Sequence, residues 1–298
     1  MSQPLISVIM SAYNSEQFIV RSLISLLIQT ISNFEILIID DGSNDKTADL
    51  IKSIKDDRII LIERENAGLT KSLNFALSKA RGIWIARQDA DDISMYNRFE
   101  CQLDFLKRNP EIGLLGSACF LLHDKYDLVN EAYLFPVTHD EIQKALYFVT
   151  PFVHGSMMIN RRLLEENGGY NEDYRYVQDY ELWNRLVSKT KAHNLRDPLY
   201  IRSVHHKSSE IQVDKEPIFQ QIRCSFFHDV QAERTILPNE SPITSVSVWP
   251  AAVTRHQKMY NKILSQQFLE MSKECRKRGL SWRRLMLNGF LHYPWSYL

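Results

Sequence analysis

The sequence predicts an α/β domain with a mostly parallel β-sheet and helices on both faces, followed by a helical C-terminal extension. Two observations predict this fold. Short apolar runs rich in β-branched residues alternate with segments whose apolar residues recur at helical spacing, as in strands joined by crossover helices. The 298 residues, 44% hydrophobic and 24% charged, also suffice for one well-packed domain and an appendage.

The first half of the chain supplies these elements in order. Strands are expected at residues 5–10, 35–39, 59–63 and 83–86, and helices at 14–30, 45–54 and 69–80. Asn14, with Gln17 three residues later, predicts an N-cap and a capping box at the start of the first helix. Further helices are expected at 214–234 and 254–278. The expected organisation is a domain at 1–211, with halves at about 1–95 and 96–211, and an extension at 212–298.

The cysteines and the N-terminus indicate a cytoplasmic protein. Cys101, Cys119, Cys224 and Cys275 lie far apart and form no C-x-x-C pair, so we expect reduced thiols rather than a zinc site or disulfides. The first residues lack the basic and apolar regions of a secretory signal. No run reaches the ~18 apolar residues of a membrane-spanning helix.

The charge of the chain is unevenly distributed. The formal net charge is zero, yet residues 254–298 carry nine Lys or Arg against two Asp or Glu. Near the C-terminus these basic residues alternate with large apolar side chains, namely Trp282, Leu285, Phe290, Tyr293 and Trp295. Such a segment suits an anionic membrane surface. The acidic balance of the rest of the chain argues against nucleic-acid binding, the other use of a basic aromatic tail.

Polar residues follow the predicted strands at their carboxyl ends, where open α/β sheets bind ligands. They are Tyr13 and Asn14, Asp40 and Asp41, Asn66 and Gly68, and the run Asp89-Ala90-Asp91-Asp92. Carboxylates there suit a nucleotide and a hard cation. An Asp-Asp-Gly-Ser turn is also common as a plain helix cap. Three carboxylates within four residues, however, repel one another and require a cation or strong donors. Neither G-x-G-x-x-G nor G-x-x-x-x-G-K-[ST] occurs, which disfavours a dehydrogenase and a P-loop NTPase.

Six motifs in order resemble one known family. They are SVIMSAYN (7–14), IIDDGSND (38–45), NAGL (66–69), IARQDADDIS (85–94), PFVHGS (151–156) and the GGY…QDYELWNRL segment (168–186). The chain resembles the inverting family 2 glycosyltransferases of the bacterial surface-polysaccharide or O-antigen type. The resemblance implies the glycosyltransferase A-type fold, whose sheet binds a nucleotide-sugar, and makes 1–211 the catalytic domain.

The resemblance also implies roles for individual residues. On the donor side, Asp41 with Asp40 would hold the uracil of a UDP-sugar, Ala12 and Tyr13 would lie against the base, and Asp89 with Ala90 would contact the ribose. Lys71 is a further donor contact. A Mn²⁺ or Mg²⁺ ion would be held by Asp91, Asp89 and His205, although the stretch around His205 and His206 is one residue longer than in the family. Further departures are Ser11 and Tyr96, where proline is usual, and Gln178 in place of Glu.

On the acceptor side, the resemblance implies contacts by His154, Gly155, Gly169 and Tyr170. Asp179 would be the general base that removes the proton of the acceptor hydroxyl. The alternative role of Asp179 is an acid at a helix N-terminus, which the helix dipole favours, and both roles are compatible. A lone histidine is more often structural than a ligand contact, so a structural role for His154 remains the alternative.

The expected function is transfer of a hexose from a UDP-sugar, best guess UDP-glucose with a β-linkage, to a hydroxyl of a lipid-diphosphate-linked sugar acceptor in O-antigen or capsule assembly. The enzyme would work in the cytoplasm, peripherally at the inner face of the membrane. Two alternatives remain. A sugar-nucleotide nucleotidyltransferase should carry a Gly-rich basic loop after the first strand, where this chain has Ser-Ala-Tyr-Asn. A catalytically inactive nucleotide-sugar-binding protein would be expected to lose Asp91 or Asp179.

Overall fold

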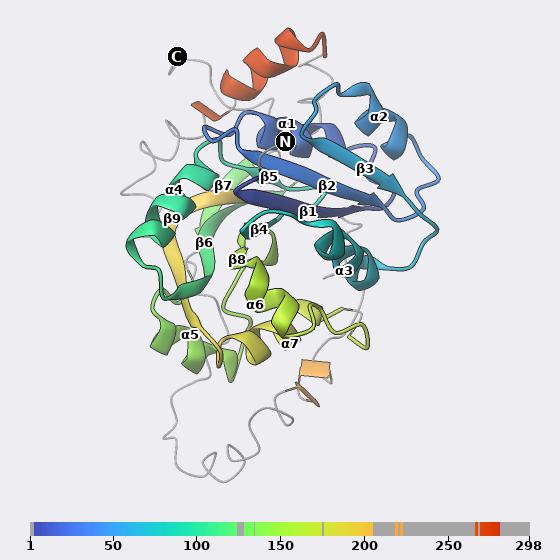
Figure 1. The fold of residues 1–298 in the computed structure, drawn as a ribbon. Helices are drawn as coiled ribbons and strands as arrows, with labels where there is room; N and C mark the ends of the chain where they lie inside the picture. The colour runs from blue at the N-terminus through green and yellow to red at the C-terminus, as the bar shows by residue number, and fades with distance from the viewer. Residues whose placement is uncertain are drawn as a thin grey trace.

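The computed structural model describes residues 3–123, 128–133, 135–174, 176–204, 218–219, 221–222, 266–267 and 269–280. The elements follow one another along the chain as shown in Figure 1. The strands are β1 (Ile6–Ala12), β2 (Phe34–Asp40), β3 (Ile59–Glu63), β4 (Trp84–Arg87), β5 (Ile93–Ser94), β6 (Ile112–His123), β7 (Leu128–Tyr133), β8 (Met158–Asn160) and β9 (Lys191–Val204). The helices are α1 (Ile19–Leu27), α2 (Thr47–Ser53), α3 (Leu69–Lys79), α4 (Arg98–Arg108), α5 (His139–Leu146), the 3₁₀ helix η1 (His154–Ser156), α6 (Arg161–Glu166) and α7 (Gln178–Leu186).

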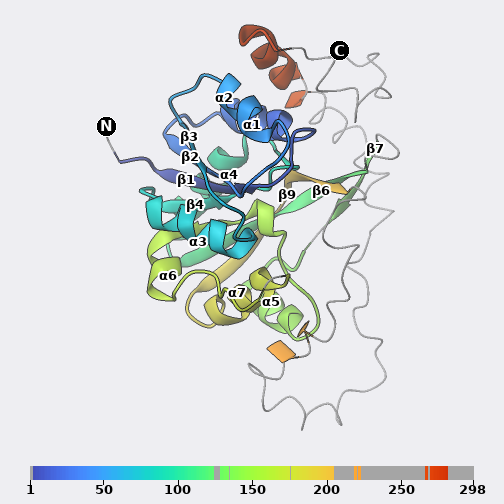
Figure 2. The same ribbon diagram turned by 90° about the vertical axis from the view of Figure 1, so that its right-hand side faces the viewer.

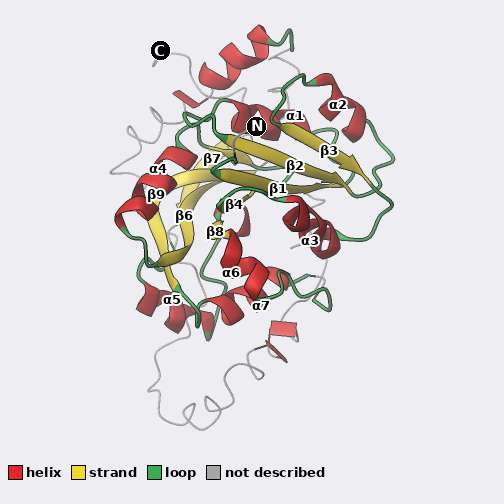
Figure 3. Cartoon of the chain, in the orientation of Figure 1, coloured by secondary structure: helices red, strands yellow, loops and turns green. Residues whose placement is uncertain are grey.

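One sheet runs through the described domain. Its strand order is β3-β2-β1-β4-β8-β6-β9-β5, and β7 pairs with β6 (Figure 3). The pairs β1–β2, β1–β4, β2–β3 and β6–β9 are parallel, whereas β4–β8, β6–β8, β5–β9 and β6–β7 are antiparallel. The sheet thus takes strands from both halves of the domain expected at 1–211. The boundary expected at residue 211 lies outside the described residues.

Helices cover both faces of the sheet, as predicted. Side chains alternate between the two faces along a strand, so Val8 of β1 belongs to the core cluster that contains residues of α1, α2 and α4, whereas Ile9 belongs to the cluster with residues of α3, α5, α6 and α7. Figure 2 shows α1 and α2 on one side of the sheet and α3, α6 and α7 on the other. The buried, β-branched strands that the apolar runs predict therefore form the central layer of a three-layer domain.

All seven elements expected in the first half exist, but the predicted start of the first helix is wrong. Helix α1 begins at Ile19, and its N-cap is Phe18, whose side chain makes no capping hydrogen bond. Asn14 instead has φ 48°, and its Oδ1 accepts a hydrogen bond from the Asn44 N–H at 2.9 Å. The Asn-x-x-Gln pattern predicted a capping box, but the asparagine side chain is used to join two loops at the ends of β1 and β2.

The C-terminal part of the described chain contains a helix at residues 269–277, within the segment predicted to be helical. Met271 and Cys275 of this helix are buried in the core on the α1 and α2 side of the sheet. Most of the helix expected at 214–234, and the basic tail beyond residue 280, lie outside the described residues. The described segments include no helix that is both long and apolar enough to cross a membrane. Cys101, Cys119 and Cys275 are free thiols, and Cys224 is not among the described residues.

Candidate active site

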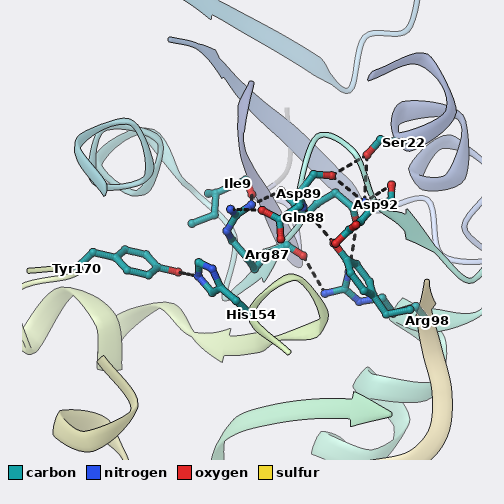
Figure 4. Close-up of polar contacts among 10 residues, drawn as sticks. Ile9, Ser22, Arg87, Gln88, Asp89, Asp92, Arg98, His154 and Tyr170 are labelled. Atoms are coloured by element: carbon teal, nitrogen blue, oxygen red, sulfur yellow. Dashed lines mark hydrogen bonds and ion pairs between the residues drawn. The ribbon is translucent and has the colours of Figure 1, made fainter. Parts of the chain in front are cut away.

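The loop that follows β4 carries the acidic run Asp89 to Asp92, whose three carboxylates have different surroundings. Figure 4 shows two of them, Asp89 and Asp92. The carboxylate of Asp89 accepts a hydrogen bond from Arg87 Nη2 at 2.6 Å and keeps 34% of its side chain exposed. Asp92 points into the protein, where its Oδ1 accepts from the Ser203 N–H at 2.7 Å. Asp91 is partly exposed. The strong donors that the acidic run requires are therefore present for Asp89 and Asp92.

Burial and mutual repulsion act against charge in this loop. Burial raises the pKa of Asp92 well above its ordinary value, and repulsion from Asp91 and Asp89 adds to the rise. The pKa of Asp89 is also raised by burial, although the neighbouring Arg87 opposes the rise. A cation at this loop would relieve the same repulsion, because it stabilises the ionised carboxylates.

A buried polar network under the loop fixes its backbone. The amide of Gln88 donates to the backbone oxygens of Asp92 at 3.0 Å and Asp89 at 3.3 Å, and to Ser22 Oγ at 3.1 Å. Arg98 of α4 donates to Gln88 Oε1 at 3.3 Å and to the backbone oxygen of Arg87 at 3.0 Å. Gln88 and Arg98 have no solvent-exposed surface. Burial lowers the pKa of Arg98 to about 10, a value at which the guanidinium remains charged at neutral pH.

Arg87, the last residue of β4, is a fully buried cation that holds Asp89. Its guanidinium also donates to the backbone oxygens of Gln88 and Ile9. Burial lowers the pKa of Arg87, but attraction to Asp89, Tyr170, Tyr200 and Asp92 together outweighs burial, and the pKa is raised overall. Sequence reasoning missed Arg87, Gln88 and Arg98. The only available signal was the position of Arg87-Gln88 between an apolar strand and the acidic run.

The Asp40-Asp41 turn, at the end of β2, is hydrogen-bonded to the turn that precedes α3. Asp41 accepts hydrogen bonds from the N–H groups of Ala67 and Gly68, both at 2.9 Å, and from Ser72 Oγ at 2.8 Å. Asp40 accepts one, from the Ser43 N–H at 3.0 Å. Asp41 therefore fixes the start of α3, and Asp40 retains more free acceptor capacity than Asp41 for a ligand.

The other predicted donor contacts lie at the same edge. Ala12 is buried at the end of β1, and its backbone oxygen accepts from the Asp41 N–H at 2.8 Å. The side chain of Tyr13 follows it and is 50% exposed. Lys71 is exposed in the first turn of α3. The carboxyl ends of β1, β2 and β4 thus carry these predicted residues together, as parallel pairing of these strands requires.

On the acceptor side, His154 and Tyr170 form a pair. His154 Nε2 lies 2.8 Å from Tyr170 Oη, and the two rings meet edge to face (Figure 4). Burial and the nearby positive charge of Arg87 hold the pKa of His154 well below its ordinary value, so the ring is neutral at pH 7. Burial raises the pKa of Tyr170. This pair is uncharged and can therefore exchange hydrogen bonds with sugar hydroxyls.

Two predicted acceptor-site glycines have packing roles in the structure. A Cβ at Gly155 would lie 2.1 Å from the hydroxyl of Tyr200, so only glycine leaves room for that ring. Gly169 has φ +67°, and a Cβ there would lie 2.8 Å from Asn74 Oδ1. That same oxygen accepts from the Tyr170 N–H at 2.9 Å. The glycines therefore place Tyr200 and Tyr170 at the site.

Asp179 is the second residue of α7 and is partly exposed. Its carboxylate accepts from the Tyr180 N–H at 2.8 Å, as an acid in the first turn of a helix does. Trp183 of the same helix meets His154 edge to face, with ring centroids 5.9 Å apart. Gly155 of η1 packs against Tyr200, whose hydroxyl accepts the Asp89 N–H at 3.1 Å. Helix α7 and the acidic loop therefore both adjoin η1. His205 and His206 lie outside the described residues.

Comparison with known proteins shows the family of the chain. Residues 7–168, more than half of the chain, match the family described as glycosyl transferase family 2. An uncharacterised glycosyltransferase of Haemophilus influenzae is 34% identical over an alignment of 195 positions that covers 61% of this chain and 60% of that relative. The O-antigen biosynthesis glycosyltransferase WbnJ of Escherichia coli is 29% identical over 69% of this chain and 82% of its own length.

Solved structures share the fold. TarS 1–349 of S. aureus, in complex with UDP-GlcNAc, has a TM-score of 0.61 at 17% identity, covering 89% of this chain and 81% of that one. The mannosyltransferase PcManGT of Pyrobaculum calidifontis, in complex with GDP-Man and Mn²⁺, has a TM-score of 0.55 at 17% identity, covering 91% and 85%. The A-type glycosyltransferase fold predicted from the sequence is confirmed. The chain belongs to glycosyl transferase family 2.

Proposed function

We propose that this chain is a metal-dependent, inverting hexosyltransferase that uses a UDP-sugar. The best candidate donor is UDP-glucose, giving a β-linkage to a hydroxyl of a lipid-diphosphate-linked sugar in O-antigen or capsule assembly. Family membership supports glycosyl transfer, the O-antigen role of WbnJ supports the pathway class, and the UDP-GlcNAc bound to TarS supports a UDP donor.

The observation that carries this proposal is the packing of η1 against both α7 and the support of the acidic loop. The ring of His154 lies 5.9 Å from that of Trp183 on α7, and Gly155 packs against Tyr200, whose hydroxyl accepts the Asp89 N–H at 3.1 Å. A donor held by Asp89, on the loop after β4, and an acceptor hydroxyl facing Asp179, in the first turn of α7, would therefore meet close to His154. This geometry suits a single displacement, because one base acts on the acceptor and no second carboxylate is placed as a nucleophile.

The residues present fit a divalent cation completed by substrate. Asp91 and Asp89 offer carboxylate oxygens, and Mg²⁺ or Mn²⁺ sites commonly combine one or two carboxylates with substrate phosphates. In the described residues no group of three or more His, Cys, Asp or Glu side chains is placed to hold a metal. We propose Asp91 and Asp89 as protein ligands, with the diphosphate supplying further oxygens. When bound, the cation supplies stabilisation of the charge that develops on the departing UDP.

The chain's own residues perform the other steps. Arg87 orients Asp89 through their 2.6 Å hydrogen bond, and Asp40 and Asp41 receive the uracil edge. Asp179 accepts the proton of the acceptor hydroxyl as the new bond from oxygen to the anomeric carbon forms and the bond from that carbon to the UDP oxygen breaks. The attack comes from the face opposite UDP, so the anomeric configuration inverts.

The direct test of the activity is release of UDP from a panel of UDP-sugars, with and without Mn²⁺, in the presence of lipid-linked acceptor. We expect release that depends on both the cation and the acceptor. Formation of UDP-sugar from sugar phosphate and UTP would instead identify a nucleotidyltransferase. Absence of turnover with retained UDP binding would identify an inactive binding protein.

The base is tested with Asp179→Asn, which keeps the shape of the side chain. We expect nearly unchanged donor binding and turnover lowered by ~10²–10⁴-fold, the range for loss of a positioned base. Asp173→Asn is the matched control, because Asp173 is exposed just before α7. If Asp179 is only a helix-terminal acid, the variant should lose ~0.3–1 kcal/mol of stability. Near-normal transfer by the folded Asp179→Asn variant would refute the base assignment.

A further inference from the structure

Gln267 is a buried residue that joins the C-terminal part of the chain to the segment immediately after the acidic loop. Its Nε2 donates to the backbone oxygen of Ser94 at 2.9 Å, and its Oε1 accepts from the Tyr96 N–H at 2.6 Å. The side chain has no exposed surface. These bonds link residues that are 173 and 171 positions apart in the sequence.

The amide of Gln267 takes the place of a neighbouring strand. The short strand β5 is the last in the order of the sheet and pairs with β9. Its far edge therefore presents backbone groups that need partners, and the C=O of residue i and the N–H of residue i+2 point the same way. A glutamine amide carries one donor and one acceptor of the kind a peptide carries. Gln267 thereby satisfies both groups at this edge.

Ser94 connects this edge to the acidic loop through one intervening residue, Gln88. Ser94 Oγ donates to Gln88 Oε1 at 2.7 Å and accepts from Arg98 Nη1 at 2.8 Å. Gln88 in turn donates to the backbone oxygens of Asp89 and Asp92. Ser94 is therefore, with Ser22 and Arg98, one of the side chains that position the amide that fixes the loop.

We propose that Gln267 is a positioning residue for the donor site, so that the C-terminal extension completes that site. It holds β5 and, through Ser94 and Gln88, the loop from Asp89 to Asp92 in the conformation that receives the cation and UDP. This inference rests on the proposed function insofar as it names the ligand. The mechanical link itself concerns only contacts within the chain.

The same extension has a second anchor that provides a control. Arg278 donates to Asp56 Oδ2 at 2.8 Å and to the backbone oxygen of Lys55 at 2.9 Å, which ties the end of the helix at 269–277 to the region between α2 and β3. Neither contact touches the acidic loop or β5. Arg278→Ala therefore weakens docking of the extension while the Gln267 bonds remain.

The test uses the full chain with Gln267→Met, which keeps the size of the side chain without its polar groups, and Gln267→Glu, which keeps an acceptor for Tyr96 but opposes the Ser94 carbonyl. Hydrogen exchange is first measured without ligand. We expect the amides of residues 89–96 to exchange ~10-fold faster or more in both variants, as loss of buried hydrogen-bond partners implies. In Arg278→Ala only the amides of residues 269–280 should exchange faster.

Binding of UDP with Mn²⁺ is then measured by calorimetry. We expect a Kd raised ~10-fold or more in the Gln267 variants and little changed in Arg278→Ala. Unchanged exchange at residues 89–96 in a folded Gln267 variant, or the same acceleration there in Arg278→Ala, would overturn the inference. Failure of the wild-type protein to bind UDP would count against the proposed function and leave the exchange result standing.

Discussion

Replacing Gly155 with alanine tests whether packing beneath η1 controls the acidic loop. The added Cβ would lie 2.1 Å from Tyr200 Oη and 2.4 Å from Tyr200 Cζ, whereas carbon and oxygen atoms normally meet at about 3.5 Å. Tyr200 is fully buried, and the guanidinium carbon of Arg98 lies 5.2 Å from its ring centroid. The ring must therefore shift. The hydroxyl that would move accepts the Asp89 N–H at 3.1 Å.

The cost has two parts. Overpacking of a filled interior costs ~1–3 kcal/mol. Loss of the acceptor for the N–H of Asp89 adds ~1–3 kcal/mol if that group is left without a partner. The sum of roughly 2–6 kcal/mol is a large share of the ~5–15 kcal/mol by which domains are stable. The second part acts on Asp89, so donor affinity should fall as well.

Urea unfolding of Gly155→Ala, Tyr200→Phe and the double variant measures this cost. Tyr200→Phe removes the atom closest to the new Cβ, so Gly155→Ala should cost less in that background than alone. Gly168→Ala is the control, because a Cβ there meets nothing within 4 Å and any loss comes from its φ of +77°. Equal costs of Gly155→Ala in both backgrounds, or a cost below ~0.5 kcal/mol, would refute the steric argument.

Three further predictions concern the site and the tail. Asp89→Ala and Asp91→Ala should each abolish transfer in a protein that stays folded by circular dichroism, and full activity in EDTA would contradict the metal role. Because the pKa of His154 is lowered by burial and by a nearby guanidinium, the unfolded chain binds a proton that the native chain does not. Stability should therefore fall as pH drops below ~6.5, with a slope of up to ~1.4 kcal/mol per pH unit. His154→Gln can still form a hydrogen bond with Tyr170 but cannot titrate, so its free energy of unfolding should depend less on pH below ~6.5. Urea unfolding at several pH values measures this, and the same pH dependence in the variant and the wild type would contradict the prediction. Deleting residues 280–298 should lower vesicle binding and activity on long lipid-linked acceptors but spare a short soluble acceptor; equal loss on both would indicate a structural role.

The sequence predicts the first four strands and their polar carboxyl ends well because both follow from local patterns, whereas β5 to β9 are not among the predicted strands. Buried strands such as β2 appear as apolar runs in the sequence. Parallel pairing then brings Asp41 and Asp89 to one edge of the sheet, independently of the conformations of the connecting loops. The expected need of the acidic run for strong donors also follows from charge alone. The structure meets it with Arg87 at Asp89 and with the Ser203 N–H at Asp92.

The supporting residues could not be predicted, because their roles depend on distant parts of the chain. Arg98 is charged and would ordinarily be expected at the surface, yet it is fully buried where β4, β5 and η1 meet. Gln267 is an ordinary polar residue of a helical segment until its partners on β5 are known. The same limit explains the error at Asn14, since a local capping pattern competes with a bond to a loop 30 positions away.

The bond between Gln267 and Ser94 sets a time order during synthesis. Residue 267 leaves the ribosome 173 residues after Ser94, which at ~5–20 residues per second is a delay of roughly 10–35 s. During that interval the strands of the first half can already pair, but the far edge of β5 still lacks this partner. If Gln267 holds the loop as proposed, the acidic loop would reach its final shape only after residue 267 has left the ribosome. A nascent chain shorter than this would therefore be expected to bind a ligand at the loop more weakly than a chain that includes residue 267.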